Sequence, residues 1–316
     1  MTDNAQKPVL IVCGPTASGK SALALDIARK FDGVIINADS MQVYRELRIL
    51  TARPSPCDEA RAPHRLYGIA SVTDPFSAGR WRELAGAEID AAHRADKLPI
   101  VCGGTGLYLK ALTEGLSEMP DIPQDVRDAV RRRVRDLGAP ACHHALSLQD
   151  PRTAAQLSPG DAQRIARALE VWEATGRPLA DWQAEKRSGP RPEWRFSTFL
   201  LAPSRATLHR AIDARFRSMI DAGALAEVRA LDGLDETLPA LKAVGVPDLR
   251  RLLAGELEES EAIERAQRAT RQFAKRQGTW FRNQIIADMA LNAQYMESFS
   301  EDFFSFIRTN VLTLTD

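Results

Sequence analysis

The chain has 316 residues, of which 44% are hydrophobic and 27% charged, enough to bury a sizeable core in more than one lobe. Its 42 Lys and Arg balance its 42 Asp and Glu, which excludes an overall charge that would draw it to nucleic acid or to an anionic membrane, so any polyanion site has to be a local patch. No apolar stretch approaches the roughly eighteen residues of a membrane span, and residues 1–8 lack a basic region followed by an apolar core. We therefore expect a cytoplasmic protein that does not enter membranes.

The cysteines give no sign of a metal site or of a disulfide framework. Cys13, Cys57, Cys102 and Cys142 are far apart in the sequence and lack C-x-x-C or paired-histidine spacing, which disfavours both kinds of site. Cys13 and Cys102 end apolar runs, so we expect both to be buried strand residues.

The first predicted strand, Val9–Cys13, leads into G-P-T-A-S-G-K-S at residues 14–21 and then into a predicted helix over Ala22–Lys30. The pattern G-x-x-x-x-G-K-[ST] between a strand and a helix is typical of a phosphate-binding loop, or P-loop. Such a loop directs backbone N–H groups, a lysine and the positive end of a helix at one anion, so we expect a di- or triphosphate ligand. The predicted diphosphate-binding residues are Gly14, Pro15, Thr16, Ala17, Ser18, Gly19, Lys20 and Ser21.

The last two of these residues have separate expected roles. The Lys20 ammonium should lie on the bridging phosphate oxygens, and the Ser21 hydroxyl should hold the Mg²⁺ that neutralises them.

A second predicted strand, Val34–Ile36, delivers Asp39 and Ser40 to its carboxyl end, where α/β sheets place their chemistry. Asp39 is suited to bind a metal or to act as general base for an acceptor facing the phosphate, but an Asp here is also ordinary capping chemistry. The residues themselves leave these three interpretations open.

A predicted helix over Ser77–Asp96 precedes a third strand, Leu98–Cys102, which ends at the glycine-rich G-G-T-G of residues 103–106. Glycines permit a ligand to approach closely, and the Thr105 hydroxyl can donate or accept a hydrogen bond. Alternation of strands and helices predicts an α/β fold with a parallel sheet.

The sequence changes character at about Met119. Residues 119–192 lack β-branched runs and show helical periodicity over Val126–Leu137 and Asp161–Ala174, which predicts a helical insertion. The core of residues 1–118 and 193–316 resumes with a predicted strand, Phe196–Leu201, after a linker-like Ser188–Pro192. Helices are then expected at Ala206–Ala222, Ala262–Arg276 and Asp302–Thr309, and we interpret Met296–Val311 as a terminal amphipathic packing element.

The C-terminal half contains one strongly basic segment. Residues 265–282 hold six Lys or Arg and no acid, and aromatic residues lie between them. Basic stripes beside aromatics suit a sugar-phosphate backbone with stacked bases, although a solvated helix face is the commoner explanation of such a stripe. Arg131–Arg135 and Gln163–Arg167 are weaker basic patches. Arg210 and Arg215 are five residues apart, so at most one should enter a site, and we select Arg215.

Seven segments in order resemble the bacterial tRNA dimethylallyltransferases, also called tRNA isopentenyltransferases, over about residues 8–284. They read G-P-T-A-S-G-K-S, A-D-S-M-Q-V-Y-R, T-A-R-P, P-H-R-L, G-G-T-G-L-Y, D-A-Q-R-I-A-R-A-L-E-V and T-R-Q-F-A-K-R-Q-G-T-W-F-R. The resemblance implies a P-loop NTPase-like parallel sheet with a helical insertion. It also implies transfer of a dimethylallyl group from dimethylallyl diphosphate, with Mg²⁺, to the N6 amine of the adenosine 3′ of the anticodon in tRNAs that read codons beginning with U. The P-loop then holds the prenyl diphosphate.

The family also implies residue roles. Asp39 takes the amine proton, while Thr105 and Arg215 lie around the diphosphate and Asp39. The helical insertion clasps the anticodon arm. Apart from the resemblance, we expect the protein to act as a monomer. The implied tRNA-binding residues are Asp39, Ser40, Met41, Gln42, Thr105, Arg127, Gln163, Arg164, Ile165, Ala166 and Arg167, with Arg271, Lys275 and Arg276 from the C-terminal basic motif. The chain departs from the family pattern at Met41, Leu50, Arg53 and Val246.

Three other functions compete with this interpretation. A P-loop kinase or NTPase should turn over ATP, but nothing in the sequence resembles a nucleotide-base pocket. An isopentenyltransferase acting on free adenine nucleotides would share the core motifs, but the helical insertion and the basic segment favour a macromolecular acceptor. An RNA-binding module with a vestigial P-loop is disfavoured because Lys20, Ser21 and Asp39 are intact.

Overall fold

The computed structural model describes residues 6–74, 76–185 and 189–313. The chain divides into two compact units, one of Met1–Thr113 with Arg191–Asp316 and one of Glu114–Pro190. Ser188, with which we expected a linker to begin, lies outside the described residues. The first unit holds the P-loop, Asp39, Thr105 and Arg215, and the second holds the predicted tRNA-binding residues Arg127 and Gln163–Arg167.

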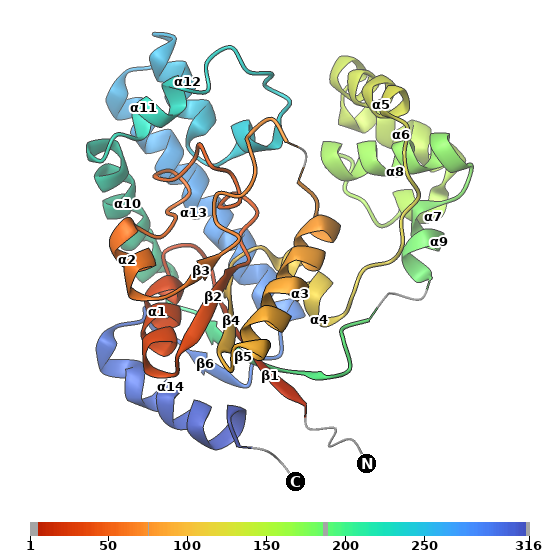
Figure 1. Cartoon of the computed structure of the whole chain (residues 1–316). Helices are drawn as coiled ribbons and strands as arrows, with labels where there is room; N and C mark the ends of the chain where they lie inside the picture. The colour runs from red at the N-terminus through yellow and green to blue at the C-terminus, as the bar shows by residue number, and fades with distance from the viewer. Residues whose placement is uncertain (1–5, 75, 186–188, 314–316) are drawn as a thin grey trace. The chain divides into compact units, whose positions relative to one another are not determined.

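The first unit is built around a parallel sheet with strand order β3-β2-β4-β1-β5-β6 (Figure 1). The P-loop strand β1 is central, and its neighbours are the strand that ends at the G-G-T-G loop and the strand that follows the insertion. The predicted α/β class with a parallel sheet is therefore confirmed. The strands are β1 Lys7–Cys13, β2 Gly33–Asn37, β3 His64–Arg65, β4 Leu98–Gly103, β5 Trp194–Leu201 and β6 Met289–Leu291.

Helices cover both faces of this sheet. Alternate residues of a strand point to opposite faces, so Leu10 and Val12 pack with α1 and α14, whereas Val9 and Ile11 pack with α3 and α4. Burial on both faces explains why the central strands read as continuous apolar runs. These helices are α1 Lys20–Lys30, α3 Ala78–Arg94, α4 Gly106–Thr113 and α14 Ser300–Phe306.

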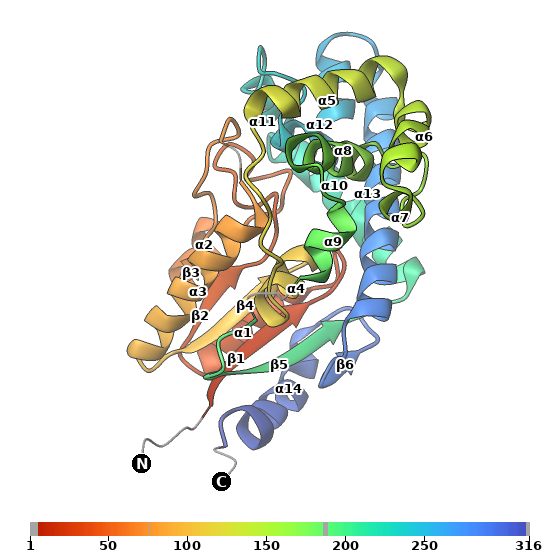
Figure 2. The ribbon, with the colours of Figure 1, turned by 90° about the vertical axis from the view of Figure 1, so that its right-hand side faces the viewer.

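A second group of helices extends the first unit beyond the sheet. The longest is α13, which packs against α10, α12 and α4 (Figure 2). Leu50 and Val246, two of the departures from the family pattern, are buried in the hydrophobic cluster of this region, where they serve packing. The helices are α10 Arg205–Asp221, α11 Ala224–Arg229, α12 Val246–Leu253 and α13 Glu259–Gln284, with α2 Pro56–Arg61 near the sheet edge.

The second unit, taken by itself, is a bundle of short helices around its own core. Val130, Leu146, Ile165 and Leu169 are fully or almost fully buried there. We predicted only the two longest of these helices from periodicity. The described residues form α5 Gln124–Leu137, α6 Ala139–Gln149, α7 Pro151–Ala154, α8 Ala162–Thr175 and α9 Leu179–Ala184.

The C-terminal segment is a packing element, as expected. Phe303, Phe304, Ile307 and Val311 are buried against α1 and the sheet. Strand β6, Met289–Leu291, precedes this segment, and the sequence did not predict it because three residues carry no periodic signal. In the part of the chain that the structure describes, no helix has the length and apolar content needed to cross a membrane.

The Trp81 side chain of α3 links α4 to the end of strand β2. It is fully buried, stacks on Tyr108 at 4.5 Å between ring centroids, and donates from Nε1 to the Asn37 carbonyl at 2.7 Å. We expect Trp81→Ala to lower the free energy of unfolding by about 3–5 kcal/mol, because it leaves a cavity and an unpaired buried carbonyl. Urea denaturation measures this loss.

The control for that measurement is Ile286→Ala. Ile286 is 98% exposed in the same unit, so its truncation should change stability by no more than about 0.5 kcal/mol. A Trp81→Ala variant as stable as this control would contradict the packing described.

Candidate active site

The P-loop connects β1 to α1 and depends on glycine at two positions. A Cβ on Gly14 would lie 2.5 Å from the Leu201 carbonyl oxygen, so only glycine permits this approach to the neighbouring strand β5. Gly19 has φ +92°, and a Cβ there would lie 2.9 Å from the Cβ of Tyr295. The loop is therefore held by both β5 and the C-terminal segment, and Tyr295 N–H also donates to the Ser18 carbonyl at 3.1 Å.

The loop's polar side chains differ in accessibility. Ser21 is exposed in the first turn of α1, and Lys20 is partly buried, with Nζ 3.4 Å from the Pro15 carbonyl. Ser18 is fully buried, and its hydroxyl lacks a hydrogen-bond partner among the described residues. Burial keeps the Ser18 side chain from solvent, whereas Thr16, Lys20 and Ser21 are the polar P-loop side chains with some exposure.

Asp39 follows β2, and the Asn37 side chain holds its backbone in place. Its N–H donates to Asn37 Oδ1 at 2.8 Å, and its carbonyl accepts from Asn37 Nδ2 at 3.0 Å. One carboxylate oxygen, Oδ1, accepts from Met41 N–H at 2.9 Å. Asn37, which the sequence did not single out, is buried and also donates to the Leu66 carbonyl at 3.1 Å.

Thr105 binds directly to the Asp39 loop. Its Oγ1 accepts from Ser40 N–H at 2.9 Å and donates to Ser40 Oγ at 3.3 Å, while Thr105 N–H donates to the Ala38 carbonyl at 3.1 Å. The close approach needs Gly103, because a Cβ there would lie 2.2 Å from the Ala38 backbone. The structure therefore brings the ends of β2 and β4 together, as expected for neighbouring parallel strands.

Arg215 reaches the P-loop from α10. Its Nη2 donates to Thr16 Oγ1 at 2.5 Å, whereas Arg210 is exposed. Burial lowers the pKa of the Arg215 guanidinium, and Asp39 opposes that shift. Burial is also the main cause that lowers the pKa of Lys20; Asp39 opposes it and Arg215 adds to it. Two cations share this desolvated site with one carboxylate, so an anionic ligand would relieve the electrostatic cost.

The C-terminal basic segment contributes a further residue to the site. Gln277 of α13 is buried, accepts from Thr16 N–H at 2.9 Å and donates to the Gly104 carbonyl at 2.9 Å. Gln277 lies within the last family-like motif, which we interpreted only as an RNA contact. In the sequence, the signal for this structural role was a neutral glutamine within a stripe of basic residues.

The basic side chains of α13 are partly neutralised. Arg271 pairs with Asp213 of α10, with Nη1 2.5 Å from Oδ1. Lys275 and Arg276 are exposed, and the Arg276 guanidinium lies 5.8 Å from the Phe273 ring centroid. Of the three residues predicted to bind tRNA here, Lys275 and Arg276 are therefore the accessible ones, while Arg271 joins two helices.

In the second unit, one predicted contact is corrected. Gln163 and Arg164 are exposed at the start of α8, but Ile165 is fully buried in the core of that unit, so its side chain is not available to tRNA. A helix turns about 100° per residue, so five consecutive positions cannot all face a ligand. Of the other residues predicted here, Ala166 is partly buried, Arg167 pairs with Glu170 at 3.5 Å, and Arg127 Nε donates to the Ile122 carbonyl at 3.1 Å.

Met41 and Gln42 follow Asp39 and are both partly buried. Gln42 Nε2 donates to the carbonyls of Thr51 at 2.8 Å and Ala52 at 3.0 Å. The predicted tRNA-binding side chain of Gln42 is thus already engaged in holding the T-A-R-P loop.

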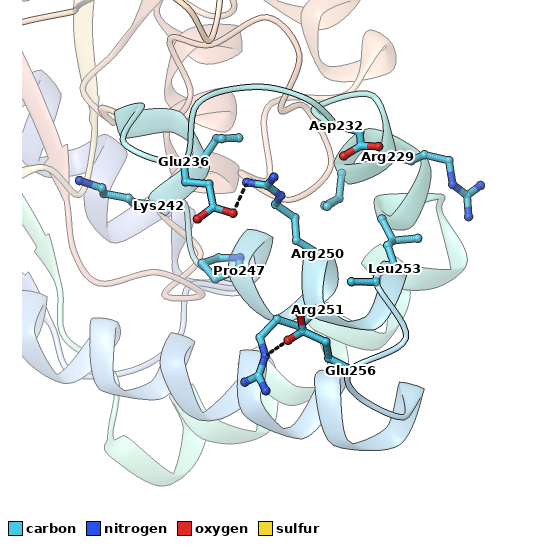
Figure 3. Close-up of a pocket in the computed structure, with 12 residues that line it drawn as sticks. Arg229, Asp232, Glu236, Lys242, Pro247, Arg250, Arg251, Leu253 and Glu256 are labelled. Carbon is cyan, nitrogen blue, oxygen red and sulfur yellow. Dashed lines mark hydrogen bonds and ion pairs between the residues drawn. The ribbon is translucent and has the colours of Figure 1, made fainter.

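A separate pocket of about 660 Å³ lies between α11 and α12 (Figure 3). Two ion pairs lie among its lining residues: Arg250 is 3.6 Å from Glu236 and Arg251 is 3.0 Å from Glu256. No P-loop residue lines it. None of the residues to which we assigned chemistry lines this pocket, so we place the chemistry at the P-loop.

No group of three or more His, Cys, Asp or Glu side chains suited to a metal ion occurs in residues 6–74, 76–185 or 189–313.

Comparison with known proteins identifies the family. The model of the family described as "IPP transferase" matches residues 42–284, more than half of the chain. The chain belongs to this family. The match begins after Asp39, so the P-loop precedes it, and residues 285–316 follow it.

Relatives and solved structures in this family are similar over nearly the whole chain. A tRNA dimethylallyltransferase of Rhodospirillum centenum is 55% identical, with 90% of this chain and 91% of that protein covered. One of Rhodospirillum rubrum is 51% identical, covering 93% and 91%. The full-length tRNA isopentenylpyrophosphate transferase of Bacillus halodurans has a TM-score of 0.69 and 30% identity, covering 96% of each chain. A eukaryotic dimethylallyltransferase acting on tRNA has a TM-score of 0.77 and 25% identity, covering 97% of this chain and 81% of its own.

Burial determines which cysteine thiols of this protein can react. Burial raises the pKa of Cys13 to about 12 and that of Cys102 to about 11, whereas Cys57 is exposed. Thiolates are the reactive form, and pH 8 is below both raised values. We expect iodoacetamide at pH 8 to modify Cys57 in the folded protein and to leave Cys13 and Cys102 intact, as measured by peptide mass spectrometry.

Cys57→Ser is the control for this labelling. It should remove the fast-reacting thiol, and guanidinium should then expose the other cysteines. Rapid native-state modification of Cys102, which lies beside Lys20, would contradict the packing of the site.

Proposed function

We propose that this chain transfers a dimethylallyl group from dimethylallyl diphosphate to the N6 amine of the adenosine 3′ of the anticodon in tRNA. One observation carries the proposal: Arg215 bonds to Thr16 of the P-loop that also bears Lys20, and Asp39 opposes the lowering of the pKa of both cations. The site thus combines an excess of positive charge for a diphosphate with a single carboxylate able to take a proton. Membership of the IPP transferase family supports the same reaction class.

The chemistry of the substrates explains this arrangement. An exocyclic aryl amine is a poor nucleophile, so the reaction depends on departure of diphosphate from the allylic carbon, where positive charge develops. The main catalytic task is to stabilise the leaving group. Backbone N–H groups of the P-loop, Lys20 and Arg215 are fixed before substrate binds and can supply this stabilisation electrostatically.

Asp39 acts as the general base in this proposal. Its Oδ1 is occupied by Met41 N–H, and no hydrogen bond to its Oδ2 is present in the described residues. A carboxylate oxygen free of internal partners can accept the proton that N6 loses when the new C–N bond forms. Thr105, bound to Ser40, holds the loop that carries this base.

Mg²⁺ is the proposed cofactor. Ser21 is exposed in the first turn of α1, next to Lys20 in the sequence, and its hydroxyl is suited to be the protein ligand of the ion. When bound, the ion would neutralise the diphosphate oxygens. Lys20 and Arg215 perform the same task from the protein side and keep the diphosphate oriented.

The tRNA contacts are proposed for two surfaces, each within one unit. The first unit offers Lys275 and Arg276 on α13, and the second offers Gln163 and Arg164 on α8, all exposed. We propose that the second unit clasps the anticodon arm and that the first receives the flipped adenosine, which costs a few kcal/mol to unstack. The P-loop, Asp39, Thr105 and Arg215 come from one chain, so a monomer is sufficient.

The first test of this function is label transfer with Asp39→Asn. The protein is incubated with radiolabelled dimethylallyl diphosphate, Mg²⁺ and unmodified tRNA, and label in RNA is counted. We expect the wild type to label the purine beside the anticodon and Asp39→Asn to be slower by about 10²–10⁴-fold, because general base catalysis is lost.

Asp32→Asn is the matched control, because Asp32 pairs with Lys97 on the surface, and it should retain full activity. Label on free AMP, or turnover of ATP without label in tRNA, would instead assign the chain to a small-molecule transferase or a kinase.

The second test concerns the exposed face of α13. Reversing both charges in Lys275→Glu with Arg276→Glu should weaken tRNA binding and reduce the slope of log affinity against log salt by up to about 2, since each lost phosphate contact removes about 1. Filter binding at several salt concentrations measures the slope. Arg29→Glu, at the exposed end of α1, is the control, and an equal effect of both variants would show a general charge effect only.

A further inference from the structure

The Gln277 carboxamide joins the two loops of the active site. Its Oε1 accepts from Thr16 N–H and its Nε2 donates to the Gly104 carbonyl, each at 2.9 Å. The side chain is 7% exposed, and both of its hydrogen-bonding ends are used. Thr16 is 261 residues away in the sequence and Gly104 is 173 residues away, so this one side chain ties three distant segments together.

These bonds extend in both directions to the proposed catalytic groups. On one side, Thr16 Oγ1 accepts from Arg215. On the other side, Gly104 is followed by Thr105, whose Oγ1 accepts from Ser40 N–H, next to Asp39. A continuous path therefore runs from the arginine at the P-loop, through Gln277, to the loop that holds the base.

The surroundings of Gln277 leave little freedom for another arrangement. A Cβ on Gly104 would lie 2.4 Å from Gln277 Nε2, and a Cβ on Gly106 would lie 2.5 Å from the Trp280 ring. Both contacts come from the buried face of α13, so the helix fits closely over the glycine-rich loop. A side chain at position 104 would push the carboxamide away.

We propose that Gln277 is a positioning residue, which sets the P-loop and the G-G-T-G loop at the spacing that prenyl transfer requires. The proposal rests on the proposed function for its reaction, and on the geometry above for the residue. A glutamine is suited to this role because one planar group offers both a donor and an acceptor, and a neutral group does not compete with Lys20 or Arg215 for the diphosphate.

The test compares Gln277→Met with Gly104→Ala and with the double variant. Methionine keeps the length and burial of the side chain but removes both hydrogen bonds. Alanine at 104 displaces the carboxamide from the other side, and its methyl also comes 3.3 Å from the Gly14 carbonyl oxygen. Gln284→Met is the matched control, because Gln284 is exposed at the end of the same helix and bonds Lys110 and the Asn283 backbone.

For each variant, kcat, the KM for dimethylallyl diphosphate, the Kd for tRNA and the Tm are measured. We expect Gln277→Met to lower kcat by about 10–100-fold, the order of loss that small misplacement of reacting groups causes, while the Kd for tRNA stays within about twofold of wild type. Gly104→Ala should do the same, and the double variant should be no worse than the poorer single variant, because both act on one contact.

Unchanged kcat in Gln277→Met would overturn the proposal. A fall in tRNA affinity as large as the fall in kcat would also overturn it, because a merely structural role would lower both. If Gln277→Met does not fold, Gly104→Ala decides by the same criteria.

A second measurement separates this proposal from the proposed function. Inorganic pyrophosphate with Mg²⁺ is titrated into wild type and Gln277→Met by calorimetry, without any prenyl transfer. If wild type fails to label tRNA, the proposed function fails, and weaker pyrophosphate binding by Gln277→Met still supports the positioning role. If the wild type does transfer the prenyl group, the positioning role is rejected when Gln277→Met has the same pyrophosphate affinity and the same kcat as the wild type.

Discussion

The active site is organised around an electrostatic imbalance. Lys20 and Arg215 lie in a desolvated region with Asp39 as their shared carboxylate, and burial lowers the pKa of both cations. Holding like charges together costs free energy in the absence of an anion, so the surrounding structure has to keep them in place. Leu201 of strand β5, Arg215 of helix α10 and Tyr295 all contact the P-loop and hold it in place.

Helix α13 shows how one segment serves two surfaces. Its exposed side carries Lys275 and Arg276, and its buried side carries Gln277 and Trp280 against the active-site loops. These residues are neighbours on one rigid helix. The same helix therefore positions the exposed basic side chains and sets the spacing of the two active-site loops. Arg271, paired with Asp213, fixes the helix to α10, which also bears Arg215.

Local patterns predicted the elements that have enough residues to show a period. The central strands, α1, α3, α5, α8 and α10 were found because their apolar spacing is continuous over several residues. Strands β3 and β6 and the short helices α2, α7, α9 and α11 were missed, since elements of a few residues are held by their neighbours and carry little signal of their own. Helices α4, α6 and α12 were missed as well. α13 is longer than predicted because its polar first turn and its aromatic end break the apolar pattern.

By itself, the sequence determined the P-loop, the parallel α/β core and the family, because these depend on short runs of adjacent residues whose spacing is visible along the chain. It could not determine which side chains meet. The bonds of Gln277 to Thr16 and Gly104, and of Arg215 to Thr16, join residues that lie 173 to 261 positions apart. Burial of Ile165 likewise depends on which face of α8 meets its unit's core. Only the tertiary structure decides such contacts, because packing selects one partner among many chemically equivalent ones.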